Sequence, residues 1–226
     1  MSLLKWPRFI NRARRTSFGA GGLVQTPTLL FASHRLSLPK EWSYPAYIDS
    51  RPYCLPTDNQ GLTSMCAAYS MAGAIEVENW RMHHVAKQQD AARIYAEAKK
   101  IDGNNSPGTS FPSVFDAAKN LGILSQGSEY ETIRSRAELM FALHKYGVCL
   151  LGFVINEGWN YCGADGWISD YDGVLGGHAV LGCFYDKDGV GFQNSWGVTW
   201  GSNGYGRMTW DQYDKQIMDG MVIGRL

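Results

Sequence analysis

The chain has 226 residues, of which 45% are hydrophobic and 13% aromatic, so it is long enough to bury a core. Its 21 Lys and Arg residues balance 21 Asp and Glu residues, and a net charge of zero provides no field that would attract nucleic acid or an acidic membrane. No apolar run approaches the roughly 18 residues of a membrane-spanning helix. These features predict a soluble protein with no transmembrane segment and no nucleic-acid partner.

Residues 1–37 are expected to form a basic arm, with the folded body beginning near Leu38. Five cations lie within the first fifteen residues, and a mildly apolar stretch follows that Gln25 and Pro27 interrupt. This order resembles a secretory signal, but its apolar part is weak. The arm can therefore be a pro-segment, an address or a tether.

Four helices are predicted between the arm and the middle of the chain. The first covers residues 64–84, with Ser64 as its N-cap, so Cys66 lies in the first turn. The other three are expected over residues 85–101, 110–122 and 135–147.

Short apolar or alternating runs after residue 147 predict strands. They cover residues 148–155, 178–186, 189–196, 205–210 and 221–226. A Gly- and aromatic-rich segment, 156–177, separates the first two and is expected to be a binding loop or lid. Helices followed by strands favour an α+β fold, with a helical half at about 60–147, a sheet half at about 148–226 and a cleft between them.

The five cysteines form an odd, sparse set without CxxC spacing, which argues against a structural zinc and a dense disulfide framework. Cys149 and Cys183 lie in apolar runs and are expected to be small buried side chains. Cys54 and Cys162 lie in loop-like sequence and can pair with a thiol that the sequence does not identify.

Cys66, His178 and Asn194 are candidates for one reactive site. A helix N-terminus and a neighbouring imidazolium both lower a thiol pKa, and Cys66 is expected to have the first of these. His178 opens a strand directly after two glycines, and Asn194 ends the next strand, where a hairpin can return it beside His178 to orient the imidazole. A lone cysteine at a helix start is more often inert, so each residue alone carries little weight.

Two further features complete the candidate site. Gln60 can offer its amide N–H, beside the backbone N–H of Cys66, to an oxyanion that forms when a thiolate adds to a carbonyl. Trp196 and Trp200 can shield the polar pair from water, although two aromatic core residues would give the same pattern.

Three stretches, "NQGLTSMCA", "GGHAVLGCFYD" and "QNSWGVTWGSNGYG", resemble the papain-like cysteine peptidases, from about residue 38 to the end of the chain. The resemblance implies a two-domain fold, with a helical left domain, an antiparallel sheet or barrel as right domain, and the active-site cleft between them. It also implies Cys66 as nucleophile, His178 as general base and then acid, Asn194 as orienting residue and Gln60 in the oxyanion hole.

The stretch "GTSFPSVFDA" is similar to the segment that lines the substrate cleft in this family, although an ordinary capped helix start would give the same pattern. The substrate-binding candidates are Thr109, Ser110, Phe111 and Pro112, with Ala179 and Trp196 across the cleft.

The chain also departs from the family pattern. Ala67 stands where members commonly have tryptophan, and Ser64 and Met65 replace a glycine and a small residue. Thr63 stands where secreted members have a disulfide cysteine, which favours a cytoplasmic over a secreted location. The spacing of Cys66 and His178 is shorter than in typical plant and lysosomal members, so the loops around the cleft are expected to differ.

The function expected from these residues is a cysteine endopeptidase that works through an acyl-enzyme on protein or peptide substrates, without metal or organic cofactor. An acyltransferase or amidase with the same residues, and a catalytically silent binding protein, remain alternatives. We also expect "GLVQTPTLLFASH" to lie extended across or beside the cleft and restrain access to Cys66, as in a zymogen. Its available anchors are Leu23, Leu29, Leu30 and Phe31.

Overall fold

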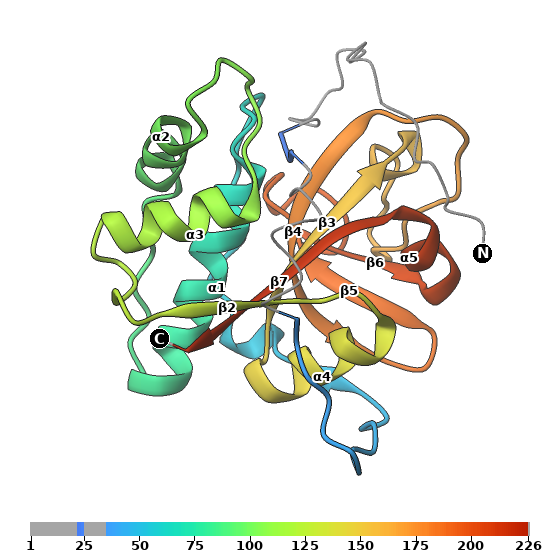
Figure 1. The fold of residues 1–226 in the computed structure, drawn as a ribbon. Helices are drawn as coiled ribbons and strands as arrows, with labels where there is room; N and C mark the ends of the chain where they lie inside the picture. The colour runs from blue at the N-terminus through green and yellow to red at the C-terminus, as the bar shows by residue number, and fades with distance from the viewer. Residues whose placement is uncertain (1–21, 25–34, 226) are drawn as a thin grey trace, which may run out of the picture.

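The computed structural model describes residues 22–24 and 35–225, which form a helical lobe beside an antiparallel sheet (Figure 1). The helices are α1 (Cys66–His83), α2 (Ala91–Asp102), α3 (Phe111–Asn120), α4 (Arg136–Tyr146) and α5 (Trp210–Gln216). The strands are β1 (Ile48–Asp49), β2 (Glu129–Thr132), β3 (Cys149–Ile155), β4 (Gly176–Tyr185), β5 (Gly189–Gln193), β6 (Tyr205–Thr209) and β7 (Ile217–Arg225). This mixture of helices and antiparallel strands confirms the predicted α+β class.

The sheet has the order β2-β7-β3-β4-β5-β6, with β1 added to the edge of β4, and every pair of strands is antiparallel. Two short 3₁₀ helices, Arg51–Tyr53 and Glu157–Trp159, lie in the connections. The second of them belongs to the long loop that was expected between β3 and β4.

Side chains on the two faces of β4 enter two different hydrophobic cores. Ala179, Leu181 and Cys183 pack with α1, α2 and α3, whereas Val180 and Tyr185 pack with α4 and the other face of the sheet. Over residues 179–183 this alternation follows from the period of two along a strand. A register shift between Gly182 and Phe184 then reverses it, so that Phe184 faces the first core and Tyr185 the second. The sheet is thus covered on both faces, and α4 belongs to the second core although it precedes residue 147.

The predicted starts hold for α3 and α4 and fail for α1 and α2. Ser110 and Ser135 cap α3 and α4 as expected, each accepting a backbone N–H three residues on. Ser64 is not a cap, because α1 begins at Cys66 with Met65 in the cap position and no side-chain hydrogen bond. The second helix begins at Ala91 and not at residue 85, because the Asp90 carboxylate accepts the N–H of Arg93.

Strands β1 and β2 and helix α5 were not predicted from the sequence. Strand β2 pairs with β7, and the seven-residue helix α5 separates β6 from β7. Helix α5 begins with a capping box in which Thr209 and Gln212 exchange hydrogen bonds. Its start had been assigned to the end of a strand, because Trp210 continues the alternating pattern of β6.

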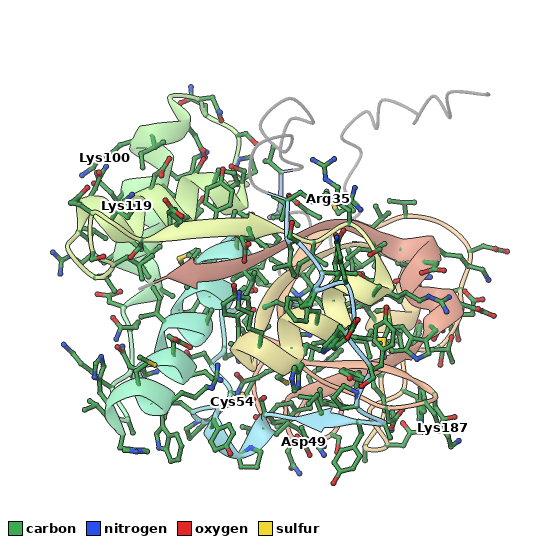
Figure 2. All side chains as sticks on the ribbon, turned by 60° about the horizontal axis from the view of Figure 1, so that its bottom comes forward. Arg35, Asp49, Cys54, Lys100, Lys119 and Lys187 are labelled. Carbon is green, nitrogen blue, oxygen red and sulfur yellow. The ribbon has the colours of Figure 1, made fainter. Side chains whose placement is uncertain are left out.

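Charged side chains project from the outside of both lobes. Lys100 and Lys119 lie on the helical lobe, and Lys187 lies at the far end of the sheet (Figure 2). Within residues 22–24 and 35–225, no helix combines the length and the apolar character needed to cross a bilayer.

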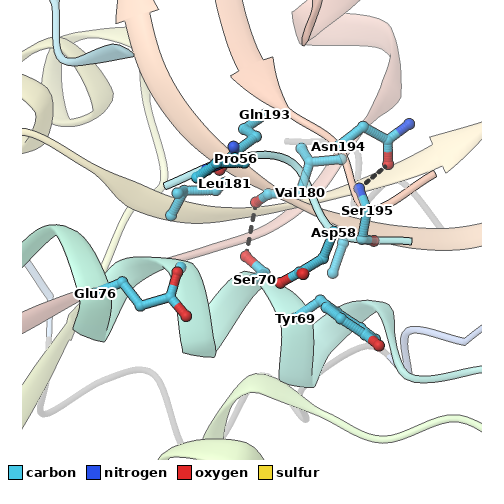
Figure 3. A pocket seen from close by; sticks show the side chains of 12 residues that line it. Pro56, Asp58, Tyr69, Ser70, Glu76, Val180, Leu181, Gln193, Asn194 and Ser195 are labelled. Carbon is cyan, nitrogen blue, oxygen red and sulfur yellow. Dashed lines mark hydrogen bonds between the residues drawn. The ribbon is translucent and has the colours of Figure 1, made fainter. Parts of the chain in front are cut away.

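Helix α1 packs closely on β4 because small residues line their contact. A Cβ on Gly73 would lie 3.0 Å from the Leu181 side chain, so a larger residue there would push the helix away. One turn after Cys66, the buried Ser70 hydroxyl donates a 2.8 Å hydrogen bond to the Val180 carbonyl (Figure 3). This bond ties the first turns of α1 to the start of β4.

We predict that Ser70→Ala lowers the free energy of unfolding by about 1–2 kcal/mol, because it leaves the buried Val180 carbonyl without this donor. Urea denaturation of the variant and the parent measures the loss. Ser125→Ala is the matched control, because the exposed Ser125 bonds only to nearby Ser128. Equal losses for the two variants would contradict the role of Ser70.

Candidate active site

His178 and Asn194 form a buried hydrogen-bonded pair. The β4–β5 hairpin brings them together, and Nε2 of His178 lies 2.8 Å from Oδ1 of Asn194. The backbone N–H of Ser195 also donates to this Oδ1 at 2.8 Å, which identifies the atom as the amide oxygen. Because that oxygen only accepts, Nε2 of His178 carries the proton. Nδ1 is then left with its lone pair, and it has no hydrogen-bond partner within the described residues.

Three tryptophans enclose this pair. The Trp196 ring lies 4.5 Å from the His178 ring, centroid to centroid, and Trp159 lies edge-on to His178 at 5.8 Å. Trp200 packs against both tryptophans and donates its indole N–H to the Trp159 carbonyl. Trp196 and Trp200 were expected here. Trp159 was not, because nothing in its local sequence distinguishes it from an ordinary loop tryptophan.

Cys66 is the first residue of α1 and is fully buried. Its sulfur accepts hydrogen bonds from the backbone N–H groups of Ala179, the neighbour of His178, and of Gly22 in the arm. These contacts place the thiol beside the start of β4. Three of the predicted residues, Cys66, His178 and Asn194, therefore lie in one place.

Burial governs the charge state of the candidate pair. It raises the pKa of the Cys66 thiol to about 11, although backbone N–H groups that bond to the sulfur act in the opposite direction. The expectation of a lowered thiol pKa is therefore wrong for this structure, because the loss of water outweighs the helix terminus. Burial also lowers the pKa of His178 to about 4, against the effect of its hydrogen bond to Asn194. Both groups are neutral at pH 7.

Gln60 lies beside Asn194 and is held from both ends of its amide. Its Nε2 donates to the Thr63 carbonyl at 2.7 Å, and its Oε1 accepts the Ser195 hydroxyl at 2.6 Å. The backbone N–H of Gln60 also donates to the Ser195 carbonyl. Ser195 was not among the predicted site residues, although it directly follows Asn194 in the sequence.

Only some of the predicted substrate-binding residues lie at this site. Ala179 and Trp196 contact Cys66 and His178, respectively. Thr109 pairs with the arm, as described below. Ser110 caps α3, whereas Phe111 is fully buried in the first core and is not a free wall of the cleft. Pro112 occupies the first turn of α3.

Residues 22–24 of the arm lie extended between the two lobes at the candidate site. The N–H of Val24 donates to the Thr109 carbonyl at 2.9 Å, and the N–H of Thr109 donates to the Gly22 carbonyl at 3.0 Å. On the other side, the N–H of Leu23 donates to the Gly177 carbonyl at 3.3 Å. A Cβ on Gly177 would lie 2.6 Å from the Leu23 carbonyl oxygen, so glycine permits this approach.

The Leu23 side chain is 5% exposed and packs over Gly152 and Met218. Val24 is 42% exposed. The other proposed anchors, Leu29, Leu30 and Phe31, lie outside the described residues.

A small pocket lies between α1, residues 179–181 of β4 and the segment 193–195 that contains Asn194 (Figure 3). Asp58 and Glu76 are among its lining residues, and burial raises the pKa of both carboxyls, that of Glu76 to about 7. The Glu76 carboxylate accepts the N–H of Gln89. Residues 22–24 and 35–225 contain no cluster of three His, Cys, Asp or Glu side chains that could hold a metal ion.

No protein-family profile and no curated protein matches the sequence. The fold is similar to that of xylellain, a cysteine protease from Xylella fastidiosa, with a TM-score of 0.78 and 18% identity over 96% of this chain and 99% of that chain.

It is also similar to digestive procathepsin L 3 of the Tenebrio molitor larval midgut (TM-score 0.68, 17% identity, 85% of this chain and 74% of that chain). A third similar structure is procathepsin B S9 from Trypanosoma congolense (TM-score 0.72, 14% identity, 93% of this chain and 87% of that chain). The chain therefore has the papain-like cysteine protease fold, as the motifs predicted.

We predict that His178 makes the protein less stable in acid. Its folded pKa of about 4 lies below the ordinary value of 6.5, so its contribution is fully present above pH 6.5 and is lost as the pH falls through 4. The total is up to about 3 kcal/mol. Glu76, whose pKa is raised, acts with the opposite sign.

Urea unfolding of the parent and of His178→Gln between pH 7 and pH 4 isolates the contribution of His178, because Glu76 titrates in both proteins. The difference between the two stabilities is expected to shrink toward acid pH. A constant difference across this range would contradict the prediction.

Proposed function

We propose that the protein is a cysteine endopeptidase with Cys66 as nucleophile, His178 as general base and acid, and Asn194 as orienting residue. The observation that carries the proposal is the His178–Asn194 pair, with Nε2–H held by Asn194 and the Cys66 sulfur bonded to the N–H of the residue next to His178. A fold shared with three cysteine proteases supports the same chemistry.

The tautomer of His178 suits the first step. With Nε2–H donating to Asn194, Nδ1 is available to take the proton from Cys66 and give a thiolate and an imidazolium. The thiolate adds to the substrate carbonyl, and the imidazolium then gives its proton to the leaving amine. Water, activated by the neutral imidazole, releases the acyl group and restores the thiol.

We assign Gln60 to the oxyanion that forms in both steps. Its amide is oriented by the Ser195 hydroxyl, which leaves Nε2 as the donor end of the side chain. The backbone N–H of Cys66, at the start of α1, is the proposed second donor. Ser195 thus acts as a positioning residue for Gln60.

We also propose that residues 22–24 of the arm inhibit the enzyme. They bond to both sides of the cleft, and the N–H of Gly22 donates to the Cys66 sulfur. An N–H group of the arm, and not a carbonyl carbon, therefore faces the Cys66 sulfur. The arm is thus not oriented as a substrate whose peptide bond is cleaved. Release of the arm would return water to Cys66 and His178 and remove the burial that keeps both neutral.

The position of the arm suggests how a substrate is held. We propose that substrate backbone pairs with Thr109 and with the Gly177 carbonyl once the arm has left. A substrate side chain would take the place of Leu23 over Gly152 and Met218, beside Ala179. This apolar surface favours an aliphatic residue at that position of the peptide.

We also propose a cytoplasmic location. Thr63 replaces the cysteine that secreted relatives use for a disulfide, which suits a reducing compartment. All five cysteines are free thiols in this structure.

We predict that an epoxysuccinyl thiol-protease inhibitor labels Cys66 and that Cys66→Ala abolishes both labelling and peptide hydrolysis while leaving the fold intact. Peptide mass mapping locates the adduct, and circular dichroism checks the fold. Cys162→Ala is the control, because the half-buried Cys162 thiol bonds to the Gly163 carbonyl and is not one of the proposed catalytic residues. An unlabelled Cys66 after displacement of the arm would favour a silent binding protein. Labelling without hydrolysis of any peptide would favour an acyltransferase or amidase.

We predict that Leu23→Asp releases the arm, because a carboxylate cannot remain on this apolar surface without a partner. Hydrolysis of a fluorogenic peptide is expected to rise at least about tenfold in kcat/KM, as the fraction of open enzyme rises. A chain that begins at Leu38, and so lacks the arm, is expected to show the same rise in kcat/KM. Val24→Asp is the matched control, because Val24 is exposed. Unchanged kcat/KM in both Leu23→Asp and the shortened chain would show that the arm is a tether or address.

A further inference from the structure

Cys54 and Cys183 lie together, away from the candidate active site. Cys183 is fully buried on β4, and Cys54 is half-buried in the segment that follows the 3₁₀ helix Arg51–Tyr53. After burial, the neighbouring Cys54 thiol is the largest cause of the raised pKa of Cys183, so the two side chains lie next to each other, and the Tyr205 hydroxyl interacts with Cys54 as well. Figure 2 labels Cys54 and also Asp49, the last residue of β1, which pairs with Phe184 next to Cys183.

Backbone hydrogen bonds at Ser50 hold the two cysteines in place. The N–H of Ser50 donates to the Cys183 carbonyl at 2.9 Å, and the Cys54 thiol donates to the Ser50 carbonyl at 3.6 Å. Cys54 also belongs to the rim of the core that contains Cys183. The two sulfurs therefore meet through tertiary structure, although 128 residues lie between Cys54 and Cys183 in the sequence.

No other described cysteine has such a neighbour. The Cys66 sulfur contacts backbone N–H groups, and Cys162 contacts the Gly163 carbonyl. Cys149 is enclosed by the second core. Cys54 and Cys183 are thus the one pair of neighbouring thiols within residues 22–24 and 35–225.

We propose that Cys54 and Cys183 are a dithiol site that a small-molecule disulfide such as glutathione disulfide converts to an intramolecular disulfide. Cys54, the more exposed thiol, attacks the glutathione disulfide as thiolate, forms a mixed disulfide and releases one glutathione. Cys183 then attacks the Cys54 sulfur and releases the second glutathione. The two protein thiols lose two electrons and two protons, which appear in two glutathione thiols.

Bond formation requires only a small movement. Two thiols in contact need to approach by on the order of 2 Å to reach the S–S bond length of about 2.05 Å. Cys54 lies outside any helix or strand, so its segment can shift without breaking a β-ladder. Arg51, the residue whose carbonyl accepts the Cys54 N–H, packs over Phe184 and keeps this segment on β4.

The cross-link would join the segment that leads to Gln60 to the strand that carries His178. It closes a loop that contains all of α1 to α4, and disulfides that close long loops restrict the unfolded chain most. Oxidation is therefore expected to stabilise the fold. This cross-link would form whether or not the protein is a peptidase.

The test uses the full chain with Cys66→Ala, so that the proposed nucleophile takes no part in the exchange. The protein is incubated with glutathione disulfide, its remaining thiols are blocked with N-ethylmaleimide during denaturation, and the masses of the chain and its peptides are measured. We expect the chain to lose two hydrogens, to react with two fewer maleimides and to yield a peptide cross-linked through Cys54 and Cys183. The Tm should rise by about 5 °C or more and return on reduction.

Cys54→Ser should lose the cross-link and the rise in Tm, whereas Cys162→Ala should keep both. Cys54→Ser is the informative variant because this half-buried side chain tolerates the change better than the buried Cys183. A glutathione adduct on Cys54 with no cross-linked peptide, or a cross-link through other cysteines, would overturn the proposal. Because no step depends on peptide hydrolysis, failure here is distinguishable from failure of the proposed activity.

Discussion

The packing of the first turns of α1 against the start of β4 is the contact on which the candidate site depends. The Cys66 sulfur accepts the Ala179 N–H, and one turn later the Ser70 hydroxyl donates to the Val180 carbonyl. Because these two contacts reach adjacent residues of one strand, they fix both the direction and the rotation of the helix. The thiol must then lie beside His178, whichever chemistry the site performs.

Exclusion of water determines the electrostatics of this contact. The β4–β5 hairpin supplies Asn194, and Trp159 and Trp196 enclose its hydrogen bond to His178. Burial favours the neutral forms of the thiol and the imidazole. The arm contributes to the same state, since its Gly22 N–H contacts the sulfur. A pair that is neutral while covered and free to ionise when exposed connects the position of the arm to the proposed regulation.

Local sequence was sufficient to predict the elements that carry the site. Small residues and good helix formers after Cys66 predicted a helix, and the alternating apolar runs around His178 and before Asn194 predicted two strands of a hairpin. The contact of the arm with the cleft was also predicted, from the apolar residues around Leu23. The start of α2 was not predicted correctly. Helix-forming residues precede Asp90, but the Asp90 side chain caps the helix, which therefore begins at Ala91.

The sequence by itself determined the α+β class, because periodicity is a local property of a chain. The papain-like fold followed from the resemblance of three stretches, which also contain Gln60, Cys66, His178 and Asn194 in order. Only the tertiary structure decided which groups lose contact with water and which distant groups meet. The raised pKa of Cys66, the Ser195 hydroxyl on Gln60 and the contact between the Cys54 and Cys183 thiols all belong to this second kind. Each depends on the approach of segments far apart in the sequence, and no local propensity encodes that approach.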